Sequence, residues 1–202
     1  MRRGFLLVLE GVDGSGKSTL AKALAQVLAA RGHEVVNTRE PTDGPYGRQI
    51  RALAAQGRNT VSPEEEFQLF HQDRQGHVRT LVRPALERGA VVIQDRSYFS
   101  TVAYQGERGL DRARLLTLSE AIAPRPDLLL VVDVPADLAV TRIRETRGSG
   151  PDDFEGQQAL ARIREVFLGF PGVVVVDGRA PPDQVLAQAL AAVDARLPAS
   201  HT

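Results

Sequence analysis

Cysteine and tryptophan are absent from the 202 residues of this chain, and aromatic residues make up only 5% of it. Without cysteine the protein can form no disulfide, hold no metal through thiolates and use no cysteine nucleophile. An excess of charge of one sign is also missing, because 25 Lys and Arg balance 25 Asp and Glu. A neutral chain has no broad basic field, so we expect no nucleic-acid partner and only a local anion site.

Long hydrophobic runs are missing as well. The opening MRRGFLLVLEGVDG has a basic tip, but its apolar run is too short for a signal peptide, and no later stretch is long enough to span a membrane. We therefore expect a cytoplasmic protein with no membrane partner. With 43% hydrophobic residues, the chain can bury one substantial core, which predicts a single domain over residues 1–202.

Apolar periodicity predicts an α/β fold. Short runs rich in Val, Ile and Leu predict strands at five places: residues 5–9, 34–38, 90–94, 127–132 and 173–177. Helical spacing is clearest at residues 18–30, 63–87, 111–123 and 182–197. Apolar strands that alternate with helices indicate a five-stranded parallel sheet flanked by helices. Glycine and proline break the helical pattern at residues 148–151, where we expect a short lid at about 147–155.

A glycine-rich loop, GVDGSGKST, follows the first predicted strand and opens the first predicted helix. It fits the pattern GxxxxGK followed by Ser or Thr, whose backbone N–H groups cradle phosphates at a helix N-terminus. Lys17 would reach the terminal phosphates, and the Ser18 hydroxyl would hold Mg²⁺. The pattern predicts a P-loop NTPase fold, with ATP bound by Gly11, Val12, Asp13, Gly14, Ser15, Gly16, Lys17, Ser18 and Thr19.

The third predicted strand ends in Asp95 and Arg96. An acid and an arginine at the carboxyl end of a parallel strand suit a metal and a second phosphate group, which favours phosphoryl transfer to an acceptor. A phosphate monoester is already anionic at neutral pH, so it needs no general base. In agreement, none of the four histidines shows a catalytic pairing, and we interpret them as surface or packing residues: His33, His71, His77 and His201.

Four segments resemble the thymidylate kinase family of nucleoside monophosphate kinases. They are LEGVDGSGKST, TREP at residues 38–41, LFHQDRQGH at residues 69–77 and VVIQDRSYFSTVAYQG at residues 91–106. The resemblance implies transfer of a phosphoryl group from ATP to dTMP, with Mg²⁺, in a homodimer formed through central helices. It also implies nine substrate-binding residues: Asp13, Arg39, Arg51, Phe70, Arg74, Arg96, Thr101, Tyr104 and Gln105.

The same resemblance implies a role for most of these residues. Phe70 would stack on thymine, and Arg74, one helical turn later, would reach the carbonyl edge of the base. Thr101 and Gln105 would hydrogen-bond the base, and Tyr104 would pack below the sugar. Other residues would meet the charged end: Arg51 and Arg96 at the monophosphate, Asp13 near the sugar 3′-hydroxyl, and Asp95 near metal and phosphates. From helical periodicity alone, Phe70 would be interpreted as a core residue, and only the resemblance places it against thymine. Asp95 could serve only to orient Arg96.

The lid departs from the family pattern. Members with glycine at the position of Gly14 usually carry a lid arginine in the form DRxE, whereas this chain reads DDFE at residues 152–155. We expect Arg147 to replace it in catalysis with Lys17, Arg96 and Asp95, unless Arg147 belongs only to a solvated basic helix face. Arg142 would stack on adenine, and Arg179 would lie in the loop that brackets adenine.

Two further differences leave alternatives open. The segment TDGPYG follows TREP, and Ser97 follows Arg96 where the family usually has tyrosine or histidine. A kinase of another monophosphate, or a deoxynucleoside kinase with Glu10 or Asp95 as base, is one alternative. A nucleotide-binding homologue that has lost turnover is another, because Asp153 stands where the lid arginine is expected.

Overall fold

The structure is a computed structural model that describes residues 4–56, 60–147 and 153–197. Within these ranges one sheet has the order β2-β3-β1-β4-β5, and all of its strand pairs are parallel. Its strands are β1 (Phe5–Glu10), β2 (Val35–Arg39), β3 (Val91–Asp95), β4 (Leu128–Asp133) and β5 (Val174–Asp177). The predicted five-stranded parallel sheet is confirmed.

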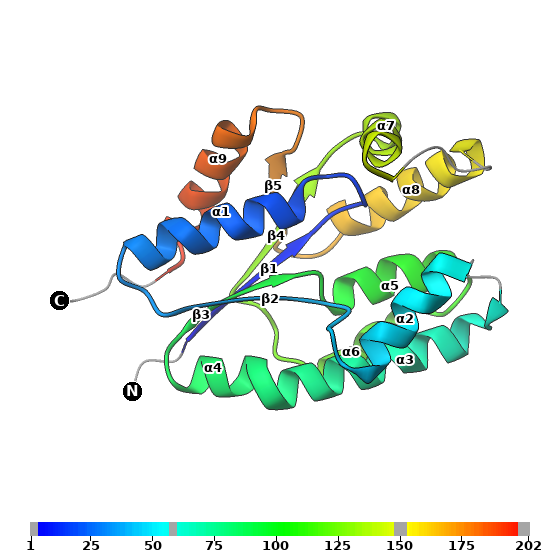
Figure 1. The fold of residues 1–202 in the computed structure, drawn as a ribbon, viewed down its shortest axis with the longest axis horizontal. Coiled ribbons are helices and arrows are strands. Elements are labelled where there is room, and N and C mark those ends of the chain that lie inside the picture. The colour runs from blue at the N-terminus through cyan, green and yellow to red at the C-terminus, as the bar shows by residue number, and fades with distance from the viewer. Residues whose placement is uncertain (1–3, 57–59, 148–152, 198–202) are drawn as a thin grey trace.

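Helices connect these strands and cover both faces of the sheet (Figure 1). In chain order they are α1 (Lys17–Ala30), α2 (Pro45–Gln56), α3 (Pro63–His77), the π-helix η2 (Val78–Val82), α4 (Arg83–Glu87), α5 (Tyr98–Glu107), α6 (Arg112–Glu120), α7 (Ala136–Arg147), α8 (Asp153–Leu168) and α9 (Pro182–Asp194). None of the described helices is long and apolar enough to cross a membrane.

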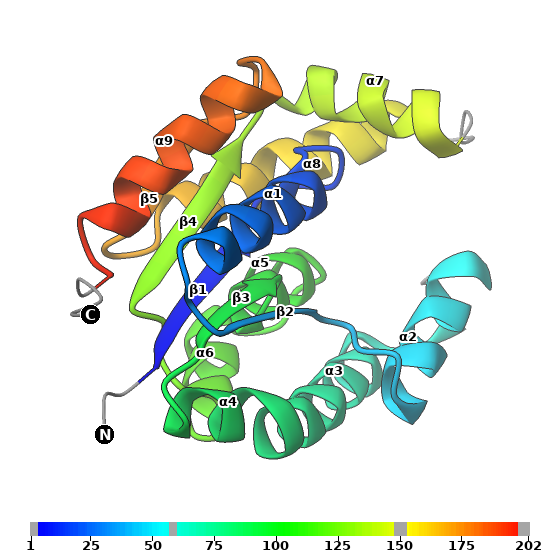
Figure 2. The same cartoon turned by 60° about the vertical axis from the view of Figure 1, so that its left-hand side comes forward.

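The core has two layers because side chains alternate along each strand. Leu7 and Leu9 of β1 face α1 and α9, where they join one buried cluster with Leu24. Leu6 and Val8 face the other way, toward the layer that contains η2, α4, α5 and α8. Figure 2 shows α1 and α9 on one side of the sheet and α4, α5 and α6 on the other. The sheet is therefore buried on both faces, as its continuous apolar strands require.

The predicted helix at residues 63–87 is interrupted by a wider turn. Its start is as expected: the Ser62 hydroxyl accepts from the Glu65 N–H, and the Glu65 carboxylate accepts from the Ser62 N–H. At residues 78–82 the backbone takes π-helical form, with the Arg83 N–H donating to the Val78 carbonyl. Pro84 follows and has no N–H for an ordinary helical bond, so the helix widens where that bond would be missing.

Candidate active site

The glycine-rich loop lies between β1 and α1, and its conformation requires glycine. Gly11, Gly14 and Gly16 have φ angles of 139°, 79° and 94°, a region that side chains disfavour. A Cβ at Gly14 would lie 2.6 Å from the Ala139 carbonyl oxygen of α7, so the loop also packs closely against that helix. Because α1 begins at Lys17, the loop turns its free N–H groups toward any phosphate bound at the helix N-terminus.

Lys17 is buried and folded onto its own loop. Its Nζ donates to the Val12 carbonyl oxygen at 2.8 Å and to the Ser15 Oγ at 3.2 Å. Burial, together with the nearby positive charge of Arg96, lowers the pKa of Lys17 to about 7. A bound triphosphate would supply the negative charge that favours the protonated amine, so nucleotide binding and protonation of Lys17 are coupled.

Ser18 and Asp95, the two predicted metal ligands, are in direct contact. The Ser18 Oγ donates to the Asp95 Oδ2 at 2.5 Å, although 77 residues separate them in the sequence. Hydroxyl and carboxylate oxygens are the donors that Mg²⁺ prefers, and this ion commonly takes one or two protein ligands and completes its shell with phosphates and water. No cluster of three or more metal-binding side chains occurs in the described ranges.

Arg96 lies at the carboxyl end of β3 in a strained backbone conformation. Its φ is 67°, and within the described part of the chain no other non-glycine residue has a positive φ. Its guanidinium donates to the Asp13 Oδ1 and to the Ser100 Oγ, both at 2.7 Å, and its Cζ lies 5.2 Å from the centre of the Tyr104 ring. Burial opposes its charge, but Tyr104 and Asp13 raise the pKa of Arg96, so it stays protonated. Strain of this kind concentrates at functional sites.

Glu10 binds the two serines that follow Arg96 at the start of α5. Its carboxylate is fully buried and accepts hydrogen bonds from the N–H groups and the hydroxyls of Ser97 and Ser100. Burial raises the pKa of Glu10, while the neighbouring positive charge of Arg96 opposes the rise. These four donors occupy the oxygens of Glu10, so Glu10 holds the start of α5 in place. Glu10 also does not line the cavity described below, so it is poorly placed to act as a base toward an acceptor.

A cavity of about 660 Å³ connects the glycine-rich loop to α3 and α5. Its walls include Lys17 and Ser18 of the glycine-rich loop and α1, Ile50 of α2 and Phe70 of α3. Figure 2 shows α2 and α7 on opposite sides of the carboxyl end of the sheet, and both helices contribute to the cavity. All nine residues predicted to bind substrate line it: Asp13, Arg39, Arg51, Phe70, Arg74, Arg96, Thr101, Tyr104 and Gln105.

Arg74 is almost fully buried at the wall of this cavity, 1% exposed. Its Nε donates to the Glu40 Oε2 at 2.9 Å, and its Nη2 donates to the Thr101 Oγ1 at 3.0 Å. Its Nη1 is buried and has no hydrogen-bond partner among the described residues. Buried donors are normally satisfied, so this orphan N–H group, in a residue that lines a cavity, fits a ligand that brings an acceptor such as a carbonyl oxygen.

The other predicted base contacts come from α5. The side chains of Thr101 and Gln105 are buried, and Gln105 uses its Nε2 to donate to the Glu66 Oε2 at 3.1 Å. Arg108 also donates to that oxygen of Glu66, which fixes the amide of Gln105 from behind. The Oε1 atom of the same side-chain amide can accept from a ligand N–H group.

Arg39 and Arg51 line the cavity, and Asp43 links them. Arg39 donates to the Asp43 carboxylate at 3.0 Å, and Arg51 donates to the same group at 2.8 Å. Arg51 also donates to the Pro41 carbonyl oxygen at 3.0 Å. Two cations gathered on one exposed carboxylate could move to a bound phosphate at small cost, because exposed ion pairs contribute little.

The residues predicted for adenine are only partly brought together. Arg142 of α7 lines the cavity and donates with both Nη atoms to the Gly178 carbonyl oxygen at 3.0 Å, which ties α7 to the loop after β5. Arg179 instead pairs with Asp177 at 2.8 Å and does not line the cavity. The predicted catalytic side chain of Arg147 and most of the predicted lid, including residues 148–152, lie outside the described residues.

Sequence reasoning missed several residues that build the site. Glu40 lines the cavity and anchors Arg74, yet in the sequence it is only the third residue of TREP. Ser97 and Ser100 bind Glu10 and also line the cavity. The spacing of those serines, three residues apart just after a strand, is a helix-start signal that could have pointed to them. The pairing of Glu40 with Arg74 has no local signal, because 34 residues separate them.

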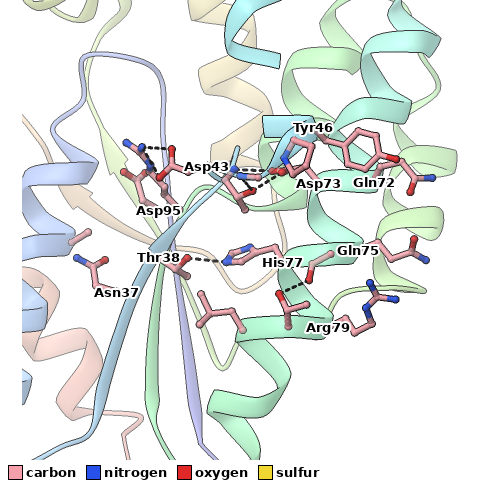
Figure 3. A pocket seen from close by; sticks show the side chains of 18 of the residues that line it. Asn37, Thr38, Asp43, Tyr46, Gln72, Asp73, Gln75, His77, Arg79 and Asp95 are labelled. Carbon is pink, nitrogen blue, oxygen red and sulfur yellow. Dashed lines mark hydrogen bonds and ion pairs between the residues drawn. The ribbon is translucent and has the colours of Figure 1, made fainter. Parts of the chain in front are cut away.

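A second cavity, of about 970 Å³, opens beside the first along β2 and α3. Figure 3 shows the side chains of Thr38, Asp73 and His77 at its walls, with His77 directed toward Thr38. Tyr46, in the segment TDGPYG that follows TREP, lines this cavity and not the first. Ser18, Arg39 and Asp95 line both, so the two cavities adjoin at the proposed metal end.

Comparison with known proteins identifies close relatives. The family model described as thymidylate kinase matches residues 9–189. A thymidylate kinase of Xanthomonas euvesicatoria pv. vesicatoria (strain 85-10) is 50% identical over 196 residues, covering 96% of this chain and 85% of the relative. A thymidylate kinase of Xylella fastidiosa (strain 9a5c) is 48% identical over 190 residues, covering 93% of this chain and 89% of the relative.

Proposed function

This chain belongs to the thymidylate kinase family, and we propose that it transfers the γ-phosphoryl group of ATP to the phosphate of dTMP, giving ADP and dTDP. One observation carries the proposal beyond the family match. A single cavity has the Lys17 end of the glycine-rich loop and the pair Phe70 and Arg74 in its walls. A donor triphosphate on the loop and an acceptor nucleotide against α3 would share that space, as in-line transfer requires.

The acceptor base is recognised by α3 and α5. Phe70 stacks on thymine, and the orphan Nη1 of Arg74 donates to the carbonyl edge of the base. Thr101 and Gln105 supply the remaining polar contacts from buried positions. Tyr104 packs under the sugar, where its ring would crowd a ribose 2′-hydroxyl and so favour deoxyribose.

The phosphates are held by cations that surround the loop. Arg96 binds the acceptor phosphate, helped by Arg51, and Lys17 neutralises charge on the donor as the phosphoryl group moves. Ser18 and Asp95 would hold Mg²⁺, which supplies charge neutralisation at the donor phosphates. No general base is needed, because the monophosphate is an anion at neutral pH.

The adenine end and the lid complete the proposal. Arg142 binds against adenine from α7, and Arg179 contributes from the loop after β5. Arg147 at the end of α7 supplies the catalytic positive charge that Asp153 cannot. The chain works as one domain over residues 1–202, in the cytoplasm, as a homodimer joined through central helices.

An acceptor panel tests the proposal. ADP formation is followed with Mg²⁺ and ATP, and dTMP, dUMP, the ribose form of TMP and thymidine are compared as acceptors. We expect the highest kcat/KM with dTMP, with loss on adding the ribose 2′-hydroxyl. Turnover of thymidine alone would refute the monophosphate acceptor, and turnover of none would support an impaired nucleotide-binding protein.

A further inference from the structure

A buried polar network adjoins the acceptor cavity, and its centre is Glu40, which also lines that cavity. The carboxylate of Glu40 is 3% exposed and accepts from three side chains. These are the Arg74 Nε at 2.9 Å, the His77 Nδ1 at 3.1 Å and the Gln94 Nε2 at 3.1 Å. Burial opposes the charge, but the adjacent Arg74 and the bond from His77 lower the pKa of Glu40. Glu40 is therefore an ionised acceptor that each of these donors helps to hold in place.

His77 is a member of the network that lies outside the acceptor cavity. It is 6% exposed, it lies in α3 three residues after Arg74, and it does not line the acceptor cavity. Its Nε2 lies 2.8 Å from the Thr38 Oγ1 of β2, the contact drawn in Figure 3. Because an ionised carboxylate can only accept, Nδ1 carries a proton toward Glu40, and in the neutral ring Nε2 accepts from Thr38.

The geometry points to His77 as a positioning residue for acceptor recognition, acting through Glu40 to hold Arg74 with its Nη1 free for the base. The inference rests on the proposed function, because it names what sets the affinity for the acceptor in that same site. Arg74 has rotatable bonds along its whole stem, so its orphan donor is useful only if the rest of the guanidinium is fixed. Glu40 and Thr101 fix it, and His77 fixes Glu40.

The groups around His77 come from three elements. Glu40 and Thr38 face it from β2 and the loop that follows, and Gln94 of β3 reaches the same carboxylate. On α3 itself, the neighbouring Asp73 turns away to accept from the Thr42 N–H and hydroxyl. The contact to Glu40 therefore links His77 to the acceptor cavity, whereas the contact to Thr38 links it only to the sheet.

A matched pair of variants separates these two contacts. An asparagine amide nitrogen stands close to the position of a histidine Nδ1, and a glutamine amide nitrogen stands close to that of Nε2. His77→Asn therefore keeps the donor to Glu40, and His77→Gln keeps the contact to Thr38. His77→Leu removes both. The kinetic constants for dTMP and for ATP are measured for each variant beside wild type, with thermal unfolding as the control for folding.

We expect His77→Leu to raise KM for dTMP roughly tenfold, as expected for losing a hydrogen bond to a charged buried group. KM for ATP should stay within about twofold, because the donor end contains no part of the network. His77→Asn should lie nearer to wild type than His77→Gln. Three results would overturn the positioning role of His77. They are an equal rise in KM for dTMP and for ATP, no rise in KM for dTMP, and a lower KM for dTMP in His77→Gln than in His77→Asn.

Failure of the proposed function gives a different result. If wild type binds dTMP but does not phosphorylate it, the proposed function fails, and the ratios of dTMP dissociation constants among the same variants still decide the role of His77. If His77→Leu does not fold, the comparison of the asparagine and glutamine variants decides it alone. Wild type that neither binds nor phosphorylates dTMP would overturn both inferences.

Discussion

The close contact of Gly14 with α7 predicts that an alanine at this position destabilises the protein. An alanine there would adopt φ of 79° and would place its Cβ 2.6 Å from the Ala139 carbonyl oxygen and 3.2 Å from the Ile143 Cγ1. The backbone conformation costs about 1–2 kcal/mol for a residue with a Cβ. The overlap with a backbone atom of α7 adds about 1–3 kcal/mol, in the range measured for overpacked sites.

Two other glycines provide matched controls. Gly16 lies in the same loop with φ of 94°, Gly32 lies outside it with φ of 87°, and a Cβ at either meets nothing within 4 Å. Alanine at these positions therefore adds the conformational cost alone. For a protein of this size about 1 kcal/mol shifts Tm by roughly 2–4 °C. We expect Gly14→Ala, at a total cost of about 2–5 kcal/mol, to lower Tm by roughly 4–20 °C, and each control by roughly 2–8 °C.

Thermal unfolding without nucleotide measures the stability difference, and KM for ATP measures its effect on function. Because α7 carries Arg142, which is bonded to the Gly178 carbonyl oxygen, a displaced α7 should also raise KM for ATP in Gly14→Ala. If Gly14→Ala unfolds at the same temperature as the two controls, the close contact between the loop and α7 is wrong.

Three further predictions concern the site itself. Since burial lowers the pKa of Lys17 to about 7 and ATP prefers the cation, ATP affinity should fall as pH rises above 7, and binding near pH 7 should take up protons. Calorimetry in buffers of different ionisation enthalpy measures the uptake, and heats that do not depend on the buffer would contradict it. Phe70→Ala should raise KM for dTMP by roughly tenfold or more while KM for ATP stays unchanged, because stacking on a base contributes about 1–3 kcal/mol; an unchanged KM for dTMP would show that Phe70 does not stack on the base. Arg147→Ala should lower kcat roughly a hundredfold, as for loss of a charge that acts in the transition state, and turnover within a few-fold of wild type would show that another group replaces the lid arginine.

The sequence was sufficient to predict the sheet and the loop because their signals are local. Continuous apolar runs marked the strands, and glycine spacing with Lys17 marked the phosphate end. It did not single out α2, because that helix buries little: only Gly47 and Ile50 are buried along its described length. It also did not show the π-helical turn, since an interrupted bond pattern before Pro84 leaves the apolar spacing nearly unchanged.

The sequence was sufficient to predict the side chains that would meet a ligand, but not the contacts that hold those side chains in place. Phe70 and Arg74 share a helix face at four-residue spacing, so the sequence could pair them. The partners that orient Arg74 come from elsewhere in the chain: Glu40 lies 34 residues before it, and Thr101 lies 27 residues after it. From the sequence His77 was interpreted as a surface or packing residue, because its contact to Glu40 depends on how β2 lies against α3.

Identifying the bond that the phosphoryl group forms tests the proposed transfer from ATP to dTMP directly. Phosphorus NMR can follow ATP, Mg²⁺ and dTMP with the enzyme and observe where the phosphoryl group arrives. If the chain phosphorylates dTMP, the dTMP singlet is replaced by the two coupled doublets of a diphosphate as ADP appears. A dTMP signal that persists while ATP loses its γ-phosphate to water, or a new monoester singlet formed only when thymidine is supplied, would contradict the proposed transfer.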